Sequence, residues 1–85
     1  MITHHFFDKQ RRGSPRSIKI AFREALEIFL ENSQDISLRN HSLSGKYSGI
    51  RSIDIASDYR ALYREGKDRI IFVAFGTHKE LYAKR

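Results

Sequence analysis

Four residues in the part of the chain expected to form the sheet carry side chains suited to acid–base or phosphate chemistry. They are two histidines, His41 and His78, together with Asp58 and Arg60. Asp58 and Arg60 are separated by a single residue, so on a strand their side chains would emerge on the same face. Tyr82 follows His78 by about one helical turn. Each of the four lies near the end of an expected element, where a rigid core can present a side chain to solvent.

This combination of side chains suits the cleavage of RNA without a metal ion. RNA supplies its own nucleophile, the 2′-hydroxyl, so the protein needs a base, a cation for the phosphorane and an acid for the leaving 5′-oxygen. Histidine can fill either proton role because its unperturbed pKa is about 6.5. Arginine suits the phosphate through its permanent charge and bidentate hydrogen bonds. Tyr82 can stack on a base or donate a hydrogen bond.

Each candidate also has an ordinary structural explanation. A lone histidine after a turn is commonly a surface residue, and Asp58 can simply stabilise a turn. Arg60 can pair with Asp54 or Glu65 on the surface of the sheet. Tyr82 can cover the core beneath a C-terminal segment. The sequence has no ligands at a recognised metal-site spacing and no glycine-rich phosphate loop, so we expect neither a metal nor a cofactor.

The segment over residues 58–82 is expected to position most of these side chains. Two antiparallel strands, joined by a turn at residues 65–68, are indicated by aromatic and β-branched residues on both sides of that turn. Gly66 is expected to supply the positive φ of the turn. Residues 70–75 are apolar at odd and even positions alike, which is typical of a central strand covered on both faces. This strand would deliver His78 at its end.

The N-terminal half predicts helices. Residues 1–7 fit a first strand that runs into a short helix over residues 8–12, and the Gly-Ser-Pro segment at residues 13–15 ends it. Ser14 is a natural N-cap and Pro15 a natural first residue for the next helix. Apolar residues then recur at three- and four-residue spacing, namely Ile18, Ala21, Phe22, Ala25, Leu26, Phe29 and Leu30. We therefore expect a long amphipathic helix over about residues 15–31.

A strand follows at residues 50–55, with Ile53 and Ile55 on one face and Ser52 and Asp54 on the other. The order of helices first and antiparallel strands second predicts an α+β fold, with the long helix packed on one face of the sheet. At 85 residues and without a linker, the chain is expected to form a single domain over residues 1–85.

The composition favours a polyanionic or acidic partner. Sixteen Lys and Arg residues against ten Asp and Glu give a formal net charge of +6, which suits nucleic acid or an acidic protein segment. The absence of cysteine excludes disulfides and Cys-ligated zinc. No apolar run approaches the roughly 20 residues needed to cross a bilayer, and there is no signal-peptide pattern. We expect a cytoplasmic protein without a membrane association.

Three segments in order, over residues 38–45, 49–63 and 76–82, resemble the YafQ-like branch of the RelE/ParE toxin superfamily. They contain Leu-Arg-Asn-His before a Ser-Leu-Ser-Gly loop, then Asp-Tyr-Arg-Ala-Leu-Tyr, then Gly-Thr-His-Lys-Glu-Leu-Tyr. The resemblance implies a RelE-like fold and a small basic toxin of a bacterial type II toxin–antitoxin module. Most such toxins are endoribonucleases (mRNA interferases) that cleave mRNA at the ribosome and inhibit translation. The implied reaction leaves a 2′,3′-cyclic phosphate and a 5′-hydroxyl.

The resemblance also assigns roles to residues. His78 of the Gly-Thr-His motif is implied to be the general acid, and His41 or Asp58 the base or the group that orients it. Arg60 matches the phosphate-stabilising arginine of the RelE branch, and Tyr82 stands where an aromatic residue positions the base. The residues implied to hold the phosphate backbone of mRNA or ribosomal RNA are Lys46, Arg51 and Arg64.

Two positions depart from the family pattern. Ser42 replaces the proline that usually follows the first histidine, and Asp54 stands where the family has a second histidine. The second change affects the proton-transfer assignment and the expected activity. An inactive toxin that still binds its antitoxin is therefore one alternative.

The implied partners are a cognate antitoxin, whose flexible segment would cover the site, and mRNA with the ribosome (rRNA). One rival function is inhibition of DNA gyrase, as in the ParE branch, without nuclease activity. Another is a non-catalytic RNA- or DNA-binding module.

Overall fold

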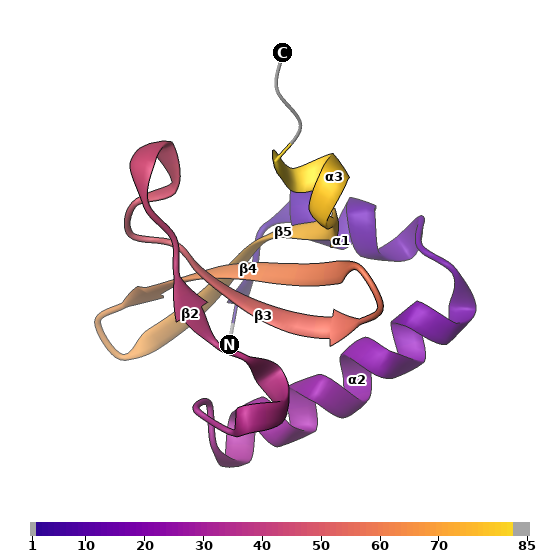
Figure 1. The fold of residues 1–85 in the computed structure, drawn as a ribbon, viewed down its shortest axis with the longest axis horizontal. Coiled ribbons are helices and arrows are strands. Elements are labelled where there is room, and N and C mark those ends of the chain that lie inside the picture. Colours follow the sequence, from indigo (N-terminus) through magenta and orange to yellow (C-terminus); the bar gives the residue numbers. More distant parts are fainter. Residues whose placement is uncertain (1, 83–85) are drawn as a thin grey trace.

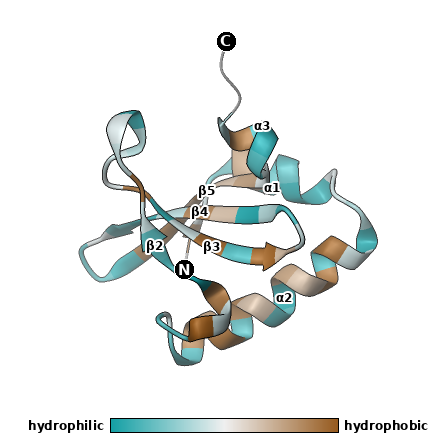
Figure 2. Cartoon of the chain, viewed as in Figure 1, coloured by the Kyte–Doolittle hydropathy of each residue, from teal (hydrophilic) through white to brown (hydrophobic). Residues whose placement is uncertain are grey.

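The computed structural model of this chain describes residues 2–82, and its longest helix is α2 (Arg16–Glu31). Hydrophobic and hydrophilic positions alternate along this helix (Figure 2). Because the apolar positions recur about once per turn, one face of the helix is buried, through Ile18, Phe22, Ala25 and Phe29. The expected helix over residues 15–31 is therefore confirmed.

The junction before α2 differs from the expectation in one respect. Ser14 is not the N-cap of α2: Pro15 holds that position, without a side-chain cap. The Ser14 hydroxyl instead donates to the carbonyl oxygen of Arg11 at 2.6 Å. The same oxygen also accepts from the Ser14 backbone N–H at 3.1 Å, so both bonds tie residue 14 to the end of α1 (His5–Arg12).

The strands of residues 2–82 form one sheet in the order β1-β5-β4-β3-β2. β2 (His41–Ser42), β3 (Arg51–Ala56), β4 (Tyr59–Gly66) and β5 (Arg69–Thr77) pair in an antiparallel manner. β1 (Ile2–Thr3) adds to β5 as a parallel edge strand. β5 is thus an interior strand, as expected, but β4 holds the middle position. The α+β fold with a mostly antiparallel sheet is confirmed (Figure 1).

The hairpin between β4 and β5 is tighter than expected. Gly66 pairs with Arg69 in the ladder, which leaves Lys67 and Asp68 as the turn in place of residues 65–68. The positive φ of this turn, 61°, belongs to Asp68 and not to Gly66. Aspartate tolerates the left-handed region because its short side chain can hydrogen-bond locally, so the expectation for Gly66 was wrong.

Aromatic rings fill the core between the helices and one face of the sheet. Phe72 of β5 lies 5.3 Å from Phe7 of α1 and 5.8 Å from both Phe22 and Phe29 of α2, measured between ring centroids. Tyr63 of β4 completes the group at 5.6 Å from Phe72. Such tilted and edge-to-face pairs bury large apolar surfaces in a preferred geometry. Within residues 2–82, no helix is long and apolar enough to cross a membrane.

The other face of the sheet carries several polar residues. α2 lies on one side of the sheet, while α3 (His78–Tyr82) and the loop that carries the 3-10 helix η2 (Gly45–Tyr47) rise on the other side (Figure 1). Because side chains alternate along a strand, β3 places Ile53 in the core and its neighbours Ser52 and Asp54 on this second face.

Candidate active site

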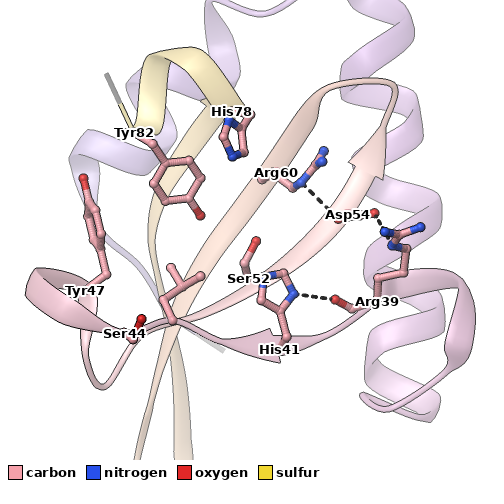
Figure 3. Close-up of a pocket in the computed structure, with 10 residues that line it drawn as sticks. Arg39, His41, Ser44, Tyr47, Ser52, Asp54, Arg60, His78 and Tyr82 are labelled. Carbon is pink, nitrogen blue, oxygen red and sulfur yellow. Dashed lines mark hydrogen bonds and ion pairs between the residues drawn. The ribbon is translucent and has the colours of Figure 1, made fainter. Parts of the chain in front are cut away.

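A pocket of about 480 Å³ opens on the second face of the sheet, between α3 and the segment from residue 39 to residue 47. Figure 3 shows side chains converging on it from strands, loops and α3. Its walls combine positive, aromatic and hydroxyl groups with one carboxylate. The lining residues are Arg39, His41, Leu43, Ser44, Tyr47, Ser52, Asp54, Arg60, His78 and Tyr82.

His41 stands on the edge strand β2, where it pairs with Ser52 of β3. Its Nδ1 donates to the carbonyl oxygen of Arg39 at 2.8 Å, because a carbonyl oxygen can only accept. Arg39 adopts the left-handed conformation, with φ 49° and ψ 45°, at the end of the 3-10 helix η1 (Ile36–Leu38). With the proton held on Nδ1, the neutral ring keeps Nε2 as a proton acceptor.

The helix η1 that precedes Arg39 is held by a side-chain cap. Asp35 accepts hydrogen bonds from the Ser37 hydroxyl at 2.7 Å and from the Ser37 N–H at 3.0 Å. These two bonds favour the carboxylate and lower the pKa of Asp35 below its ordinary value. The cap therefore orders the turn that presents Arg39 and His41.

His78 is the first residue of α3, directly after β5. Its backbone N–H donates to the carbonyl oxygen of Asp58 at 2.9 Å, which ties it to the β3–β4 turn. Thr77 and Glu80 form a capping box: the Glu80 N–H donates to the Thr77 hydroxyl oxygen, and the Thr77 N–H donates to Glu80 Oε1. A Cβ at Gly76 would lie 2.8 Å from that Glu80 oxygen, so any larger residue there would require the Glu80 side chain to shift.

Two tyrosines join the loop around η2 to α3. The Tyr47 hydroxyl donates to the carbonyl oxygen of Leu81 at 2.8 Å, and its ring meets the Tyr82 ring edge-on at 5.5 Å. The Tyr82 ring also lies 4.6 Å from the His78 imidazole, between centroids. These contacts hold both ends of the pocket at a defined separation and place an aromatic surface next to His78.

The opposite wall carries a carboxylate between two arginines. Asp54 Oδ1 lies 3.1 Å from Arg60 Nε, and Asp54 Oδ2 lies 3.3 Å from Arg39 Nε. The Arg60–Asp54 pair was one of the structural alternatives for Arg60. It does not remove Arg60 from the site, because Arg60 also lines the pocket.

The hydroxyl of Ser52 lies at the floor of the pocket, between His41 and Arg60 (Figure 3). Ser52 is 1% exposed, and its Oγ is the one buried side-chain polar atom of residues 2–82 without a hydrogen-bond partner. Because an unpaired buried hydroxyl is unfavourable for folding, such groups call for an explanation in function or hydration.

The structure brings four of the residues singled out in the sequence to one pocket: His41, Arg60, His78 and Tyr82. Asp58 is exposed in the turn before β4, outside the strand expected to carry it, and it contacts His78 through its backbone. Its carboxylate does not line the pocket.

The three cationic residues expected to hold phosphate lie outside the pocket wall. Lys46 stands beside it, with its ammonium 5.4 Å from the centre of the Tyr47 ring. Arg51 donates from Nε to Asn40 Oδ1 at 2.9 Å, and it alternates with Ser52 so that it faces the other side of the sheet. Arg64 is exposed on β4.

Several lining residues were not singled out from the sequence, among them Arg39, Tyr47 and Ser52. The role of Arg39 depends on a left-handed backbone, and that of Ser52 on the β2–β3 register; neither is readable from local composition. The capping box had a signal, because Thr77 and Glu80 stand at the required spacing before a helical segment.

The arrangement fits the binding of a nucleotide phosphate. Two guanidiniums and one carboxylate leave an excess of positive charge on one wall, and an imidazole stands on each side of the opening. The aromatic wall offers a stacking surface. Residues 2–82 contain no group of three or more His, Cys, Asp or Glu side chains arranged to hold a metal ion.

Solved structures of bacterial and archaeal toxins share this fold. YafQ from E. coli strain BL21(DE3) superposes with a TM-score of 0.82 at 15% identity, covering 96% of both chains. The RelB–RelE antitoxin–toxin complex from Methanococcus jannaschii matches with 0.79 at 20% identity, covering 100% of this chain and 99% of that chain. A copper-bound mutant toxin from Helicobacter pylori matches with 0.72 at 23% identity, covering 95% and 96% respectively.

Sequence comparison identifies the family. No curated protein sequence matches the chain significantly. The family model described as "Bacterial toxin of type II toxin-antitoxin system, YafQ" matches residues 2–83. The resemblance noted in the sequence is thus confirmed, and this chain belongs to the YafQ family of toxins of bacterial type II toxin–antitoxin systems.

Proposed function

We propose that this toxin is an endoribonuclease that cleaves mRNA at the ribosome and thereby inhibits translation. The observation that carries the proposal is the convergence of His41, Arg60 and His78 on one pocket from three separate elements. A base, a cation and an acid around one space are what 2′-hydroxyl attack on a phosphodiester requires. Family membership supports the same reaction.

In the proposed mechanism, His41 Nε2 removes the proton from the 2′-hydroxyl. The resulting oxygen attacks the adjacent phosphorus, and the guanidinium of Arg60 stabilises the charge of the phosphorane. The bond from phosphorus to the 5′-oxygen then breaks as His78 donates a proton to that oxygen. The products are a 2′,3′-cyclic phosphate and a 5′-hydroxyl. The hydrogen bond from His41 Nδ1 to Arg39 supports His41 over Asp58 as the base.

The remaining walls suit the rest of the RNA. Tyr82 and Tyr47 offer rings on which a base next to the cleaved bond can stack, a contact worth about 1–3 kcal/mol per base. Lys46, Arg51 and Arg64 would contact backbone phosphates of mRNA or ribosomal RNA further from the scissile bond. The net charge of +6 favours such contacts.

The proposed protein partner is a cognate antitoxin. Structures of two toxins with this fold contain the bound antitoxin: the DinJ–YafQ complex of E. coli and the RelB–RelE complex of Methanococcus jannaschii. An antitoxin segment that places carboxylates over the guanidiniums of the pocket would compete with RNA phosphate for the same charges.

Replacing His78 with alanine tests the reaction. Inducing the wild-type chain alone in a bacterium should stop growth and produce cuts in mRNA, mapped by primer extension. His78→Ala should abolish both, because proton donation to the 5′-oxygen is lost. The fold should persist because His78 is exposed, which circular dichroism and thermal unfolding can check.

His5 provides the matched control, since it is an exposed histidine outside the pocket. His5→Ala should keep both growth arrest and cleavage. Retained cleavage in His78→Ala would remove His78 from the mechanism. Intact transcripts with blocked replication in the wild type would instead favour the gyrase-inhibitor function of the ParE branch.

A further inference from the structure

Asp54 occupies the wall of the pocket with both carboxylate oxygens already engaged. Arg60 Nε lies 3.1 Å from Oδ1 and Arg39 Nε lies 3.3 Å from Oδ2. The side chains of Asp54 and Arg60 are 25% and 21% exposed, whereas that of Arg39 is 79% exposed. Because solvent weakens exposed ion pairs, the Arg60–Asp54 ion pair is stronger than the Arg39–Asp54 ion pair.

These contacts determine where the Arg60 guanidinium can point. Its Nε is engaged with Asp54, and its Nη1 reaches the carbonyl oxygens of Ser57 and Tyr59 at 3.4 Å and 3.3 Å. Within the described residues, Nη2 has no hydrogen-bond partner. With Nε and Nη1 held in this way, Nη2 is left to donate to an anion.

Arg39 connects the Arg60–Asp54 ion pair to His41, the candidate base. Its side chain approaches Asp54, and its backbone carbonyl oxygen accepts the hydrogen bond from His41 Nδ1 at 2.8 Å. Figure 3 shows the three contacts as one chain from Arg60 through Asp54 and Arg39 to His41. The phosphate-binding cation and the imidazole are therefore oriented through the same pair of residues.

Building on the proposed ribonuclease function, we propose that Asp54 is a positioning residue, which with Arg39 holds Arg60 against the scissile phosphate. Asp54 acts through Arg60 and transfers no proton itself. The orientation of the Arg60 guanidinium affects the rate of cleavage, since a displacement of about 1 Å at a reacting centre can lower the rate about 100-fold.

Asp54→Asn is the direct test because it keeps the size of the side chain and removes the charge that orients Arg60. The rate of single-turnover mRNA cleavage on programmed ribosomes should fall by roughly 10- to 100-fold. The affinity for RNA should stay the same or rise, because the variant is more positive. Asp68→Asn makes the same charge change in the exposed β4–β5 turn and should leave the rate unaltered.

The pH dependence separates positioning from proton transfer. Asp54→Asn should keep both limbs of the pH–rate profile, because the two histidines that carry the protons remain. Loss of one limb in this variant would make Asp54 a proton-transfer group and would overturn the proposal. An unaltered cleavage rate would overturn it as well.

Arg39→Gln tests the contribution of the Arg39–Asp54 ion pair. If Arg39 acts through Asp54, the double variant with Asp54→Asn should cleave no more slowly than Asp54→Asn alone. Equal fold-losses from Arg39→Gln in both backgrounds would mean that Arg39 acts independently, contrary to the proposal. Arg23→Gln, an exposed change on α2, is the control for charge.

A readout without RNA keeps this proposal separate from the ribonuclease function. The Nε–H of Arg60 should give a distinct, slowly exchanging signal in 15N-resolved NMR spectra of the wild type and of Asp68→Asn. Asp54→Asn should move that signal or broaden it by exchange, and an unchanged signal would contradict the positioning role. A wild-type protein that shows the expected signal but cleaves no mRNA would refute the ribonuclease function alone.

Discussion

At the scale of single residues, the two histidines of the pocket are held in different ways. The His41 ring is oriented by the carbonyl of Arg39, whereas His78 is placed through its backbone bond to Asp58 and its ring contact with Tyr82. The type and spacing of these histidines were sufficient to single them out in the sequence. Their partners were not predictable, because a left-handed residue and a strand register are products of folding.

Ser52 gives a prediction at this scale. Ser52→Ala removes a buried hydroxyl without a partner, so the free energy of unfolding should stay the same or rise by up to about 1 kcal/mol. Urea denaturation measures it. Ser37→Ala, which removes a hydroxyl bonded to Asp35 at 2.7 Å, should be destabilising by comparison. A marked loss of stability in Ser52→Ala would mean that the hydroxyl has a partner in solution.

At the scale of elements, local patterns predicted the helices better than the turns. α2 was located to within a residue because its apolar periodicity depends only on neighbouring turns of one helix. The β4–β5 turn was placed too broadly, since the ladder continues through Gly66 and Asp68 adopts the positive φ. Ser14 has the chemistry of a cap, yet the nearby end of α1 competes for its hydroxyl.

At this scale, the capping box of α3 predicts that the helix opens locally when the capping hydroxyl is removed. Thr77→Ala removes the acceptor for the Glu80 N–H, a change that costs about 0.5–2 kcal/mol at helix N-termini. Because α3 is short, the loss should take the form of local opening: amide hydrogens of α3 should exchange faster and mRNA cleavage should slow. Thr77→Ser keeps the hydroxyl and should preserve both. Unchanged exchange in Thr77→Ala would show that packing alone orders α3.

At the scale of the whole molecule, the helices-then-strands order was sufficient to predict the α+β arrangement with α2 on one face of the sheet. The parallel pairing of β1 with β5 was not foreseen, because nothing in residues 2–3 indicates which strand they join. It follows from the position of α1, whose Phe7 enters the core beside Phe72. The pocket itself is a tertiary feature, assembled from segments around residues 39–60 and 78–82.

At this scale, the aromatic core predicts a large loss of stability when one of its central rings is removed. Phe72→Ala removes a fully buried ring that contacts four other aromatic residues, so the free energy of unfolding should drop by about 3–5 kcal/mol. That is a large part of the roughly 5–15 kcal/mol typical of native proteins. Phe6→Ala, at a half-exposed ring, should cost far less. Similar losses in thermal or urea unfolding of both variants would contradict this description of the core.

The contact between β1 and β5 also has a consequence for biosynthesis. Ile2 pairs with Ile71, so residue 71 must have been synthesised before residue 2 can take its place in the sheet. A nascent chain carries His41 and Arg60 well before His78 leaves the exit tunnel. On the ribosome, the complete pocket can therefore assemble only after residues 69–82 have emerged.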